Sequence, residues 1–188
     1  IVFQDVCFGY ERFNDVLDGV SFTAKPGQTI AILGATGSGK TSLVHLLQRL
    51  YERTAGSITI AGTDVNDIDH GHLRRNIGIV LQEPFLYSRT IMENIRICAP
   101  CSTEEDVYNA ARTASVHDVI ESFDLGYETL VGERGVTLSG GQQQRVAIAR
   151  TLMQNAPILI FDDSMSAVDS ETDAAIRKSL FALNRVGI

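Results

Sequence analysis

The glycine-rich stretch LGATGSGKTSL restricts the fold of this chain more than any other feature, because of the segments on either side of it. Residues 29–33, before it, read TIAIL, a threonine followed by four apolar residues without alternation, as in strands that are buried on both faces of a sheet. Leucines recur at helical spacing along residues 41–50, which indicates an amphipathic helix. Glycine adopts backbone conformations that other residues avoid. The order therefore predicts a buried strand, a tight loop and a helix.

The loop has the spacing G-x-x-x-x-G-K-[ST]. Backbone N–H groups in such a loop, together with the N-terminus of the following helix, bind phosphate oxygens. The lysine reaches the outer phosphates, and the next hydroxyl is a ligand for Mg²⁺. The alternative is a glycine-rich turn with a surface lysine, but the flanking strand and helix favour a phosphate site. Its predicted residues are Gly34, Ala35, Thr36, Gly37, Ser38, Gly39, Lys40, Thr41 and Ser42.

A second apolar run, residues 158–161, ends in two adjacent acids, Asp162 and Asp163. A buried strand holds its tip in a fixed position, so we expect the Asp162 carboxylate to hold Mg²⁺ opposite the phosphate loop. Asp163 is then placed to orient or deprotonate an attacking water. The alternative is that the two acids only terminate a strand.

The remaining pattern predicts an α/β domain. Residues 77–81 form another continuous apolar run, which favours a mostly parallel sheet covered by helices. Residues 20–25 and 56–62 instead alternate, which is typical of antiparallel strands with one face in water. Further helices are expected at about residues 102–114, 141–154 and 170–183, and we interpret residues 102–123 as a helical insert.

Composition narrows the class of protein. The formal net charge of −7 argues against a broad basic face for nucleic acid. No apolar run approaches the roughly 20 residues that span a bilayer, and the abrupt ends suggest a piece of a longer protein. Cys98 and Cys101 have redox-motif spacing. They do not follow a strand as in thioredoxin-like folds, and two ligands are too few for structural zinc.

The segment Leu138, Ser139, Gly140, Gly141, Gln142 closely resembles the signature motif of ATP-binding cassette (ABC) ATPases. The phosphate loop upstream and the acidic strand downstream also match the order of that family. The resemblance implies a P-loop NTPase fold over residues 1–188, with a helical subdomain at roughly residues 102–150. It also implies ATP and Mg²⁺ as ligands. Two nucleotide-binding domains would pair head to tail, each signature acting on the partner's ATP.

Further residues match positions to which the family gives roles. Tyr10 lies where an aromatic ring stacks on adenine, although a core tyrosine at a strand end is an alternative. Gln82 matches the glutamine that touches Mg²⁺ or the water and reports nucleotide state to the transmembrane partner. Asp169 matches an aspartate that crosses the dimer interface. Glu133, in an exporter-like VGERG segment, would face the coupling helices of a membrane domain.

The chain departs from the family pattern in two places. The family's switch histidine follows the acidic strand, whereas the histidines here all precede it, so that residue is expected beyond Ile188. Asp163 stands where most active members have glutamate, and its side chain is one methylene shorter. A base displaced by about 1 Å costs on the order of 10²-fold in rate. We therefore expect weak hydrolysis, as in the altered half of heterodimeric exporters, although a tolerated substitution is the alternative.

The resemblance thus implies an ATP-hydrolysing domain of an exporter at the cytoplasmic face of a cell membrane. Its partners would be transmembrane domains and an identical or, preferably, different nucleotide-binding domain. A soluble ABC ATPase of DNA maintenance or translation is one alternative, but the sequence has no heptads and is acidic. A regulatory module that binds nucleotide without turnover is another.

Overall fold

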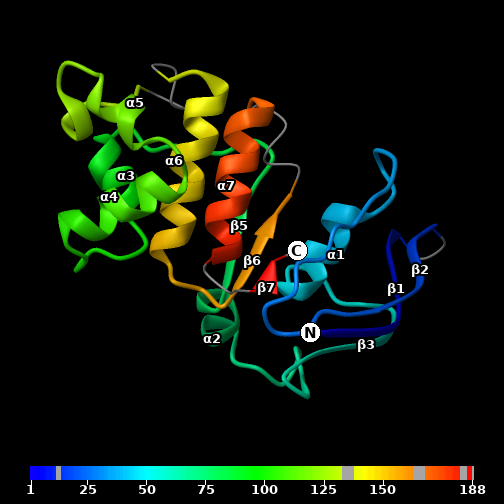
Figure 1. The fold of residues 1–188 in the computed structure, drawn as a ribbon. Coiled ribbons are helices and arrows are strands. Elements are labelled where there is room, and N and C mark those ends of the chain that lie inside the picture. Colours follow the sequence, from blue (N-terminus) through cyan, green and yellow to red (C-terminus); the bar gives the residue numbers. More distant parts are fainter. Residues whose placement is uncertain (12–13, 133–137, 163–167, 183–185, 188) are drawn as a thin grey trace. The chain divides into compact units, whose positions relative to one another are not determined.

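The computed structural model describes residues 1–11, 14–132, 138–162, 168–182 and 186–187 (Figure 1). The chain divides into two compact units. The first unit contains Ile1–Ile77, Pro157–Asp162 and Arg185–Ile188, and the second contains Gly78–Ala156 and Asp163–Asn184. No helix in the described ranges is long and apolar enough to cross a membrane.

An antiparallel sheet forms much of the first unit. Its strands are β1 (Val2–Glu11), β2 (Asn14–Thr23), β3 (Ala55–Ile60) and β4 (Thr63–Asp64), in the order β2-β1-β3-β4. Phe3 is paired with Phe22 on β2 and with Ile58 on β3. The rings of Phe3 and Phe22 stack with their centroids 4.5 Å apart. These strands confirm the antiparallel pairing predicted from alternation in residues 20–25 and 56–62.

Helix α1 (Lys40–Leu47) follows the glycine-rich loop and buries Leu43, Leu46 and Leu47. The helix is shorter than predicted, because Gln48 is its C-cap and Arg49 has a left-handed φ of 53°. The prediction that Leu50 continues the buried face was therefore wrong.

The predicted buried strand at residues 29–33 was also wrong. Residues 30–35 have no regular secondary structure, and Leu33 is 91% exposed. An apolar run favours burial, but a strand also needs neighbours for its main-chain hydrogen bonds. In the first unit, β6 (Ile158–Phe161) forms its parallel ladder with β7 (Val186–Gly187), with Ile158 opposite Val186.

Strand β6 itself confirms the second prediction of a buried strand. Ile158, Leu159 and Ile160 are buried, so the strand places Asp162 just beyond its carboxyl end. The N–H of Ile158 donates to the Asn76 carbonyl at 3.3 Å, just after α2 (His70–Arg75). The short helix α2 was not predicted, although Asp69 caps it by accepting from the His72 N–H at 2.8 Å.

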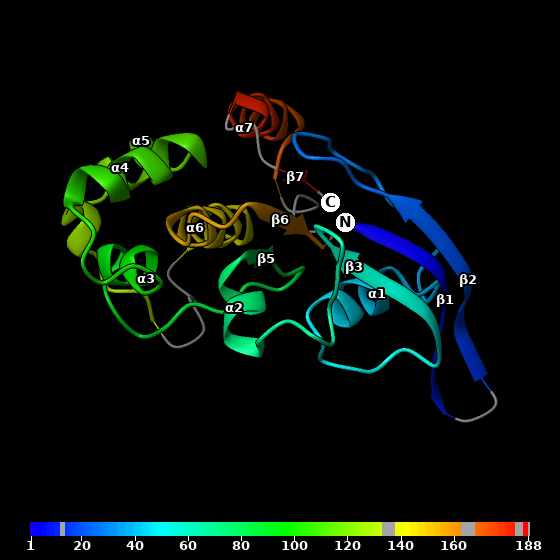
Figure 2. The same ribbon diagram turned by 90° about the horizontal axis from the view of Figure 1, so that it is seen from below.

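The second unit is mainly helical (Figure 2). Helices α3 (Ile91–Arg96) and α4 (Glu104–Thr113) both pack against α6 (Gly140–Met153), whose buried residues include Val146, Ile148 and Ala149. Helices α4, α6 and α7 agree with the predicted helices to within a few residues at either end, whereas α3 was not predicted. The elements are β5 (Ile77–Val80), α3 (Ile91–Arg96), α4 (Glu104–Thr113), α5 (His117–Glu121), the 3₁₀ turn η1 (Gly126–Glu128), α6 (Gly140–Met153) and α7 (Ser170–Ala182).

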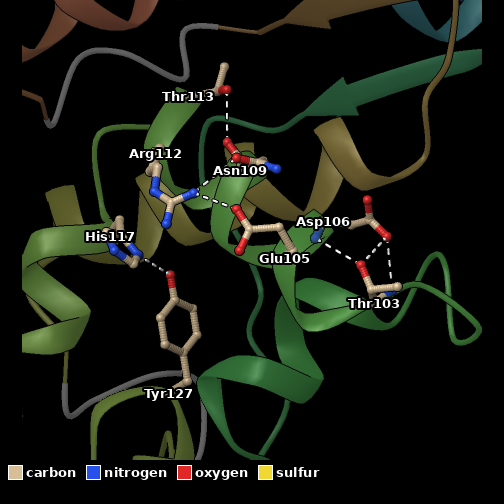
Figure 3. Close-up of polar contacts among 8 residues, drawn as sticks. All are labelled: Thr103, Glu105, Asp106, Asn109, Arg112, Thr113, His117 and Tyr127. Carbon is tan, nitrogen blue, oxygen red and sulfur yellow. Dashed lines mark hydrogen bonds and ion pairs between the residues drawn. The ribbon is translucent and has the colours of Figure 1, made fainter.

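Capping boxes begin three of these helices, and Figure 3 shows the one at α4. The Thr103 hydroxyl accepts from the Asp106 N–H at 3.2 Å, and the Asp106 carboxylate accepts from the Thr103 N–H at 2.8 Å. Such reciprocal bonds satisfy N–H groups that have no partner within the helix. Near the end of α4, Arg112 pairs with Glu105 at 2.8 Å (Figure 3). The α4 start therefore agrees with the predicted capping hydroxyls.

Candidate functional site

The backbone of the phosphate loop favours glycine at two positions. Gly37 and Gly39 have left-handed φ angles of 82° and 89°, which side chains disfavour. A Cβ on Gly39 would lie 2.7 Å from Leu17 Cδ2 on β2, and one on Gly34 would overlap the Ser38 hydroxyl. A side chain at Gly39 is therefore disfavoured by both the backbone conformation and the close neighbours, whereas a Cβ at Gly34 requires the Ser38 hydroxyl to move.

Lys40 begins α1 and folds back over the start of the loop. Its ammonium group donates to the Gly34 carbonyl at 2.8 Å and to the Ala35 carbonyl at 2.9 Å. The positive charge is therefore held beside the loop backbone, where phosphate oxygens are predicted to bind. Ammonium–carbonyl bonds exchange readily for stronger bonds to phosphate, because the latter pair opposite charges.

Thr41 and Asp162 meet although they are far apart in the sequence. The Thr41 hydroxyl donates to Asp162 Oδ2 at 3.0 Å and lies 3.3 Å from Oδ1, across a separation of 121 residues. Both groups are hard oxygen ligands, as Mg²⁺ requires. The described residues contain no cluster of three or more His, Cys, Asp or Glu that could hold a metal. This donor set fits Mg²⁺, which keeps several waters and phosphate oxygens among its ligands.

Tyr10 lies at the end of β1, beside the first turn of α1. Its hydroxyl oxygen is 3.0 Å from the buried Ser42 hydroxyl, and either group is able to donate. The ring remains 54% exposed and touches Phe8 and Tyr51 edge to face. The structure thus brings the predicted adenine-stacking residue together with the phosphate loop.

The signature segment opens α6. The Ser139 hydroxyl accepts from the Gln142 N–H at 3.3 Å, and the Gln142 side chain accepts from the Ser139 N–H at 2.9 Å. Leu138 is buried, and its carbonyl accepts from the Gln143 side chain at 2.9 Å. Gly140 and Gly141 occupy the first two helical positions, so their N–H groups lie at the helix N-terminus.

Side chains of α6 hold the segment that contains the exposed Gln82. Gln144 donates to the Leu81 carbonyl at 3.1 Å, and Thr151 donates to the Ile79 carbonyl at 3.3 Å. Arg150 donates to the Phe85 carbonyl at 2.7 Å. Sequence reasoning missed these contacts. A polar residue at a buried helix position indicates a hydrogen-bond partner in the core, and Gln144, which is only 2% exposed, is such a residue.

Asp169 lies just before α7 and accepts from the Thr172 N–H at 2.9 Å. Hydrogen bonds from Thr172 hold the pKa of the Asp169 carboxyl below its usual range, and Arg145 contributes in the same direction. Asp169 is therefore a carboxylate at neutral pH. Asp163 and Glu133 lie outside the described residues.

The two cysteines of the C-x-x-C stretch are free thiols. Loss of solvation raises the pKa of the Cys98 thiol, and the positive charge of Arg150 offsets this only in part. A higher pKa lowers the fraction of reactive thiolate. The raised pKa therefore gives no support to the redox hypothesis for Cys98.

Comparisons with known proteins agree with this geometry. Residues 17–166 match the ABC transporter family. Over 96% of its length the chain is 46% identical to the "Putative multidrug export ATP-binding/permease protein YgaD" of Bacillus subtilis, of which it covers 31%. Over 98% of its length it is 45% identical to the "Beta-(1-->2)glucan export ATP-binding/permease protein NdvA" of Agrobacterium fabrum, of which it covers 32%.

A solved structure, "Structure of a bacterial Atm1-family ABC exporter with ATP bound", matches the whole chain with a TM-score of 0.95 and 41% identity, and the chain covers 33% of it. The chain therefore spans about a third of the length of these relatives. The shared fold confirms the predicted class, a P-loop NTPase with an α/β core. Within that class, the chain belongs to the ABC transporter family, and the relatives it matches are named as export ATP-binding/permease proteins and an ABC exporter.

Proposed function

We propose that this chain binds and hydrolyses ATP to power export across a membrane, as the cytoplasmic domain of a larger transporter. The ATP-binding/permease names of its relatives support this proposal. The observation that carries it is the contact of the Thr41 hydroxyl with the Asp162 carboxylate at 3.0 Å. That contact joins the phosphate loop to the acid at the tip of β6, which is the arrangement that a nucleotide with Mg²⁺ requires.

Each group in the first unit has a role in this proposal. The backbone of residues 34–42 binds the phosphates, and Lys40 moves its ammonium from the loop carbonyls to the outer phosphates. Thr41 and Asp162 hold Mg²⁺, which when bound neutralises developing charge on the phosphates. Tyr10 stacks against adenine with its exposed face.

The second unit supplies the groups that act on the water and on the partner. Gln82 contacts Mg²⁺ or the attacking water, and Asp163 orients or deprotonates that water. Asp169 contacts the second domain across the dimer, and Glu133 faces the membrane domain. The signature, Leu138, Ser139, Gly140, Gly141 and Gln142, binds the partner's ATP, and the first-turn N–H groups of α6 support this role.

Asp163 in place of glutamate supports slow hydrolysis at this chain's own site, because the shorter side chain reaches less far toward the water. We infer that the second nucleotide-binding domain is a different chain that carries a competent acid. Asp163 also favours one other function, a module that binds ATP without hydrolysing it. An assay with the partner domain separates the two, because a regulatory module stays inactive in the complex.

The proposal is tested first by ATP binding. Lys40→Ala is expected to weaken ATP affinity at least about tenfold, since it removes a charge-assisted contact to phosphate. Lys25→Ala is the matched control, because Lys25 is an exposed lysine of the same unit, and this variant should bind ATP like the parent. Calorimetry with Mg-ATP measures both. Undiminished affinity in Lys40→Ala contradicts the assignment of the phosphate loop.

A further inference from the structure

Three aromatic side chains of the first unit contact one another beside the phosphate loop. The Tyr10 ring centroid lies 4.8 Å from that of Phe8 and 5.1 Å from that of Tyr51. Both contacts are edge to face, with interplanar angles of 77° and 88°, which is a favoured arrangement of aromatic rings. Phe8 and Tyr51 also touch, at 5.7 Å. Tyr10 is thus held by two rings that support each other.

The third restraint on Tyr10 is its hydroxyl group. The hydroxyl oxygen lies 3.0 Å from the hydroxyl of Ser42, which is buried in the first turn of α1. When the phenol donates this bond, Ser42 keeps its own proton to donate elsewhere. The ring is therefore fixed at its tip as well as along its sides.

Tyr51 is itself tied to α1. The left-handed Arg49 ends the helix, and the N–H of Leu50 donates to the His45 carbonyl at 2.9 Å. This turn brings the Tyr51 ring back beside α1, with its centroid 5.7 Å from the His45 ring. Tyr51 therefore connects the end of the phosphate-loop helix to the ring of Tyr10.

The cluster is fixed but not hidden. Phe8 is buried, whereas Tyr10 is 54% and Tyr51 45% exposed. A ring that is ordered before a ligand arrives avoids the loss of rotamer freedom on binding. Accessibility combined with restraint from three directions is what a stacking surface for a planar ligand requires.

We propose that Tyr51 is a positioning residue for nucleotide binding, which holds the Tyr10 ring in the orientation that receives the base. This inference rests on the proposed function, because it takes Tyr10 as the base-stacking residue. Tyr51 lies outside the signature, the phosphate loop and the acidic strand, so none of these motifs predicts a role for it. This role of Tyr51 also predicts that the base end of the site can be weakened without disturbing the phosphate end.

The experiment compares two ligands on the same variants. ATP carries a base, whereas tripolyphosphate offers only phosphates, and calorimetry with Mg²⁺ gives both affinities. An edge-to-face pair and an ordered side chain each contribute a factor of about 2 to 10 in affinity. Tyr51→Ala is expected to weaken ATP binding about 3- to 10-fold and to leave tripolyphosphate affinity within about twofold.

Two variants serve as controls for the ring. Tyr51→Phe keeps the aromatic contact and should bind ATP like the parent. Phe22→Ala removes a ring from the stacked Phe3–Phe22 pair of the same sheet, away from Tyr10, and should also leave ATP affinity unchanged. Tyr51→Leu repeats the test with a larger apolar side chain if the alanine variant does not fold, as judged by thermal unfolding.

The outcomes separate this inference from the function on which it rests. A parent chain that binds neither ligand overturns both proposals. A parent that binds both, together with Tyr51 variants of unchanged ATP affinity, overturns only the role of Tyr51. Equal losses for ATP and tripolyphosphate also overturn it, because they indicate that the whole site has loosened. Selective loss of ATP binding, restored in Tyr51→Phe, supports the inference.

Discussion

Asn94 offers the sharpest test of how the second unit is held together, because its side chain is completely buried on α3. Its amide oxygen accepts from the Tyr87 N–H at 2.8 Å and from the Arg150 guanidinium at 3.0 Å. Its amide nitrogen donates to the carbonyls of Tyr87 at 2.9 Å and Thr90 at 3.0 Å. The amide nitrogen also lies 3.4 Å from the Arg89 carbonyl, so one side chain bonds to two donors and three acceptors.

Asn94→Ala leaves two donors without this acceptor. A buried main-chain N–H that loses its partner costs about 1–3 kcal/mol, and a bond to a charged group contributes about 1.5–3 kcal/mol. Tyr87 is partly exposed, so water recovers some of the loss. The two losses together would cost about 2.5–6 kcal/mol. Because water recovers part of this, we expect the free energy of unfolding to fall by about 3 kcal/mol.

Urea unfolding followed by circular dichroism measures this change. Asn109→Ala is the matched control, because Asn109 lies exposed on α4 and loses only a solvent-exposed bond from Arg112 at 3.0 Å, and it should change stability by less than about 0.5 kcal/mol. In an Arg150→Met background, Asn94→Ala should cost less, because the guanidinium donor has already been removed. A loss below about 1 kcal/mol for Asn94→Ala alone would refute the reasoning, since even one orphaned donor should exceed it.

Two further predictions concern carboxylates. Asp163→Glu should raise steady-state ATP turnover at saturating Mg-ATP, because the longer side chain reaches the water, and a folded variant with unchanged turnover contradicts the argument from reach. Hydrogen bonds from Thr103 hold the pKa of Asp106 below its usual range, so its contribution to stability is present above about pH 4 and is lost as pH falls through the folded-state pKa. Asp106→Asn should therefore flatten the dependence of the urea midpoint on pH below about pH 4, and a slope equal to that of the parent would count against the capping role.

The parts of the site that depend on local pattern were predictable. Glycine spacing marks the loop because Gly37 and Gly39 have left-handed φ angles and Gly39 also has close neighbours at its Cβ position. The capping hydroxyl of Thr103 marks the start of α4, since N-caps are chosen by local hydrogen bonding. Asp162 follows a run that is buried as expected. In each case the physical cause lies within a few residues of the signal.

Features that depend on distant partners were not predictable in the same way. The run at residues 29–33 favours burial, but whether it forms a strand depends on neighbouring strands that the sequence pattern does not identify. Arg150 contacts Phe85 and Asn94 across separations of 65 and 56 residues, and a lone arginine on a helix does not identify those partners. The contact of Tyr51 with Tyr10 likewise depends on the turn at Arg49, which the sequence pattern does not predict.

The contact between Thr41 and Asp162 also has a consequence for how the chain folds. Because 121 residues separate the two groups, the proposed metal-binding half of the site forms only after a long loop has closed. During synthesis, the phosphate loop leaves the ribosome well before Asp162, so an early fragment contains the loop residues without this acid. Mg-ATP, which requires both, should bind the finished fold in preference to such fragments and stabilise it by mass action.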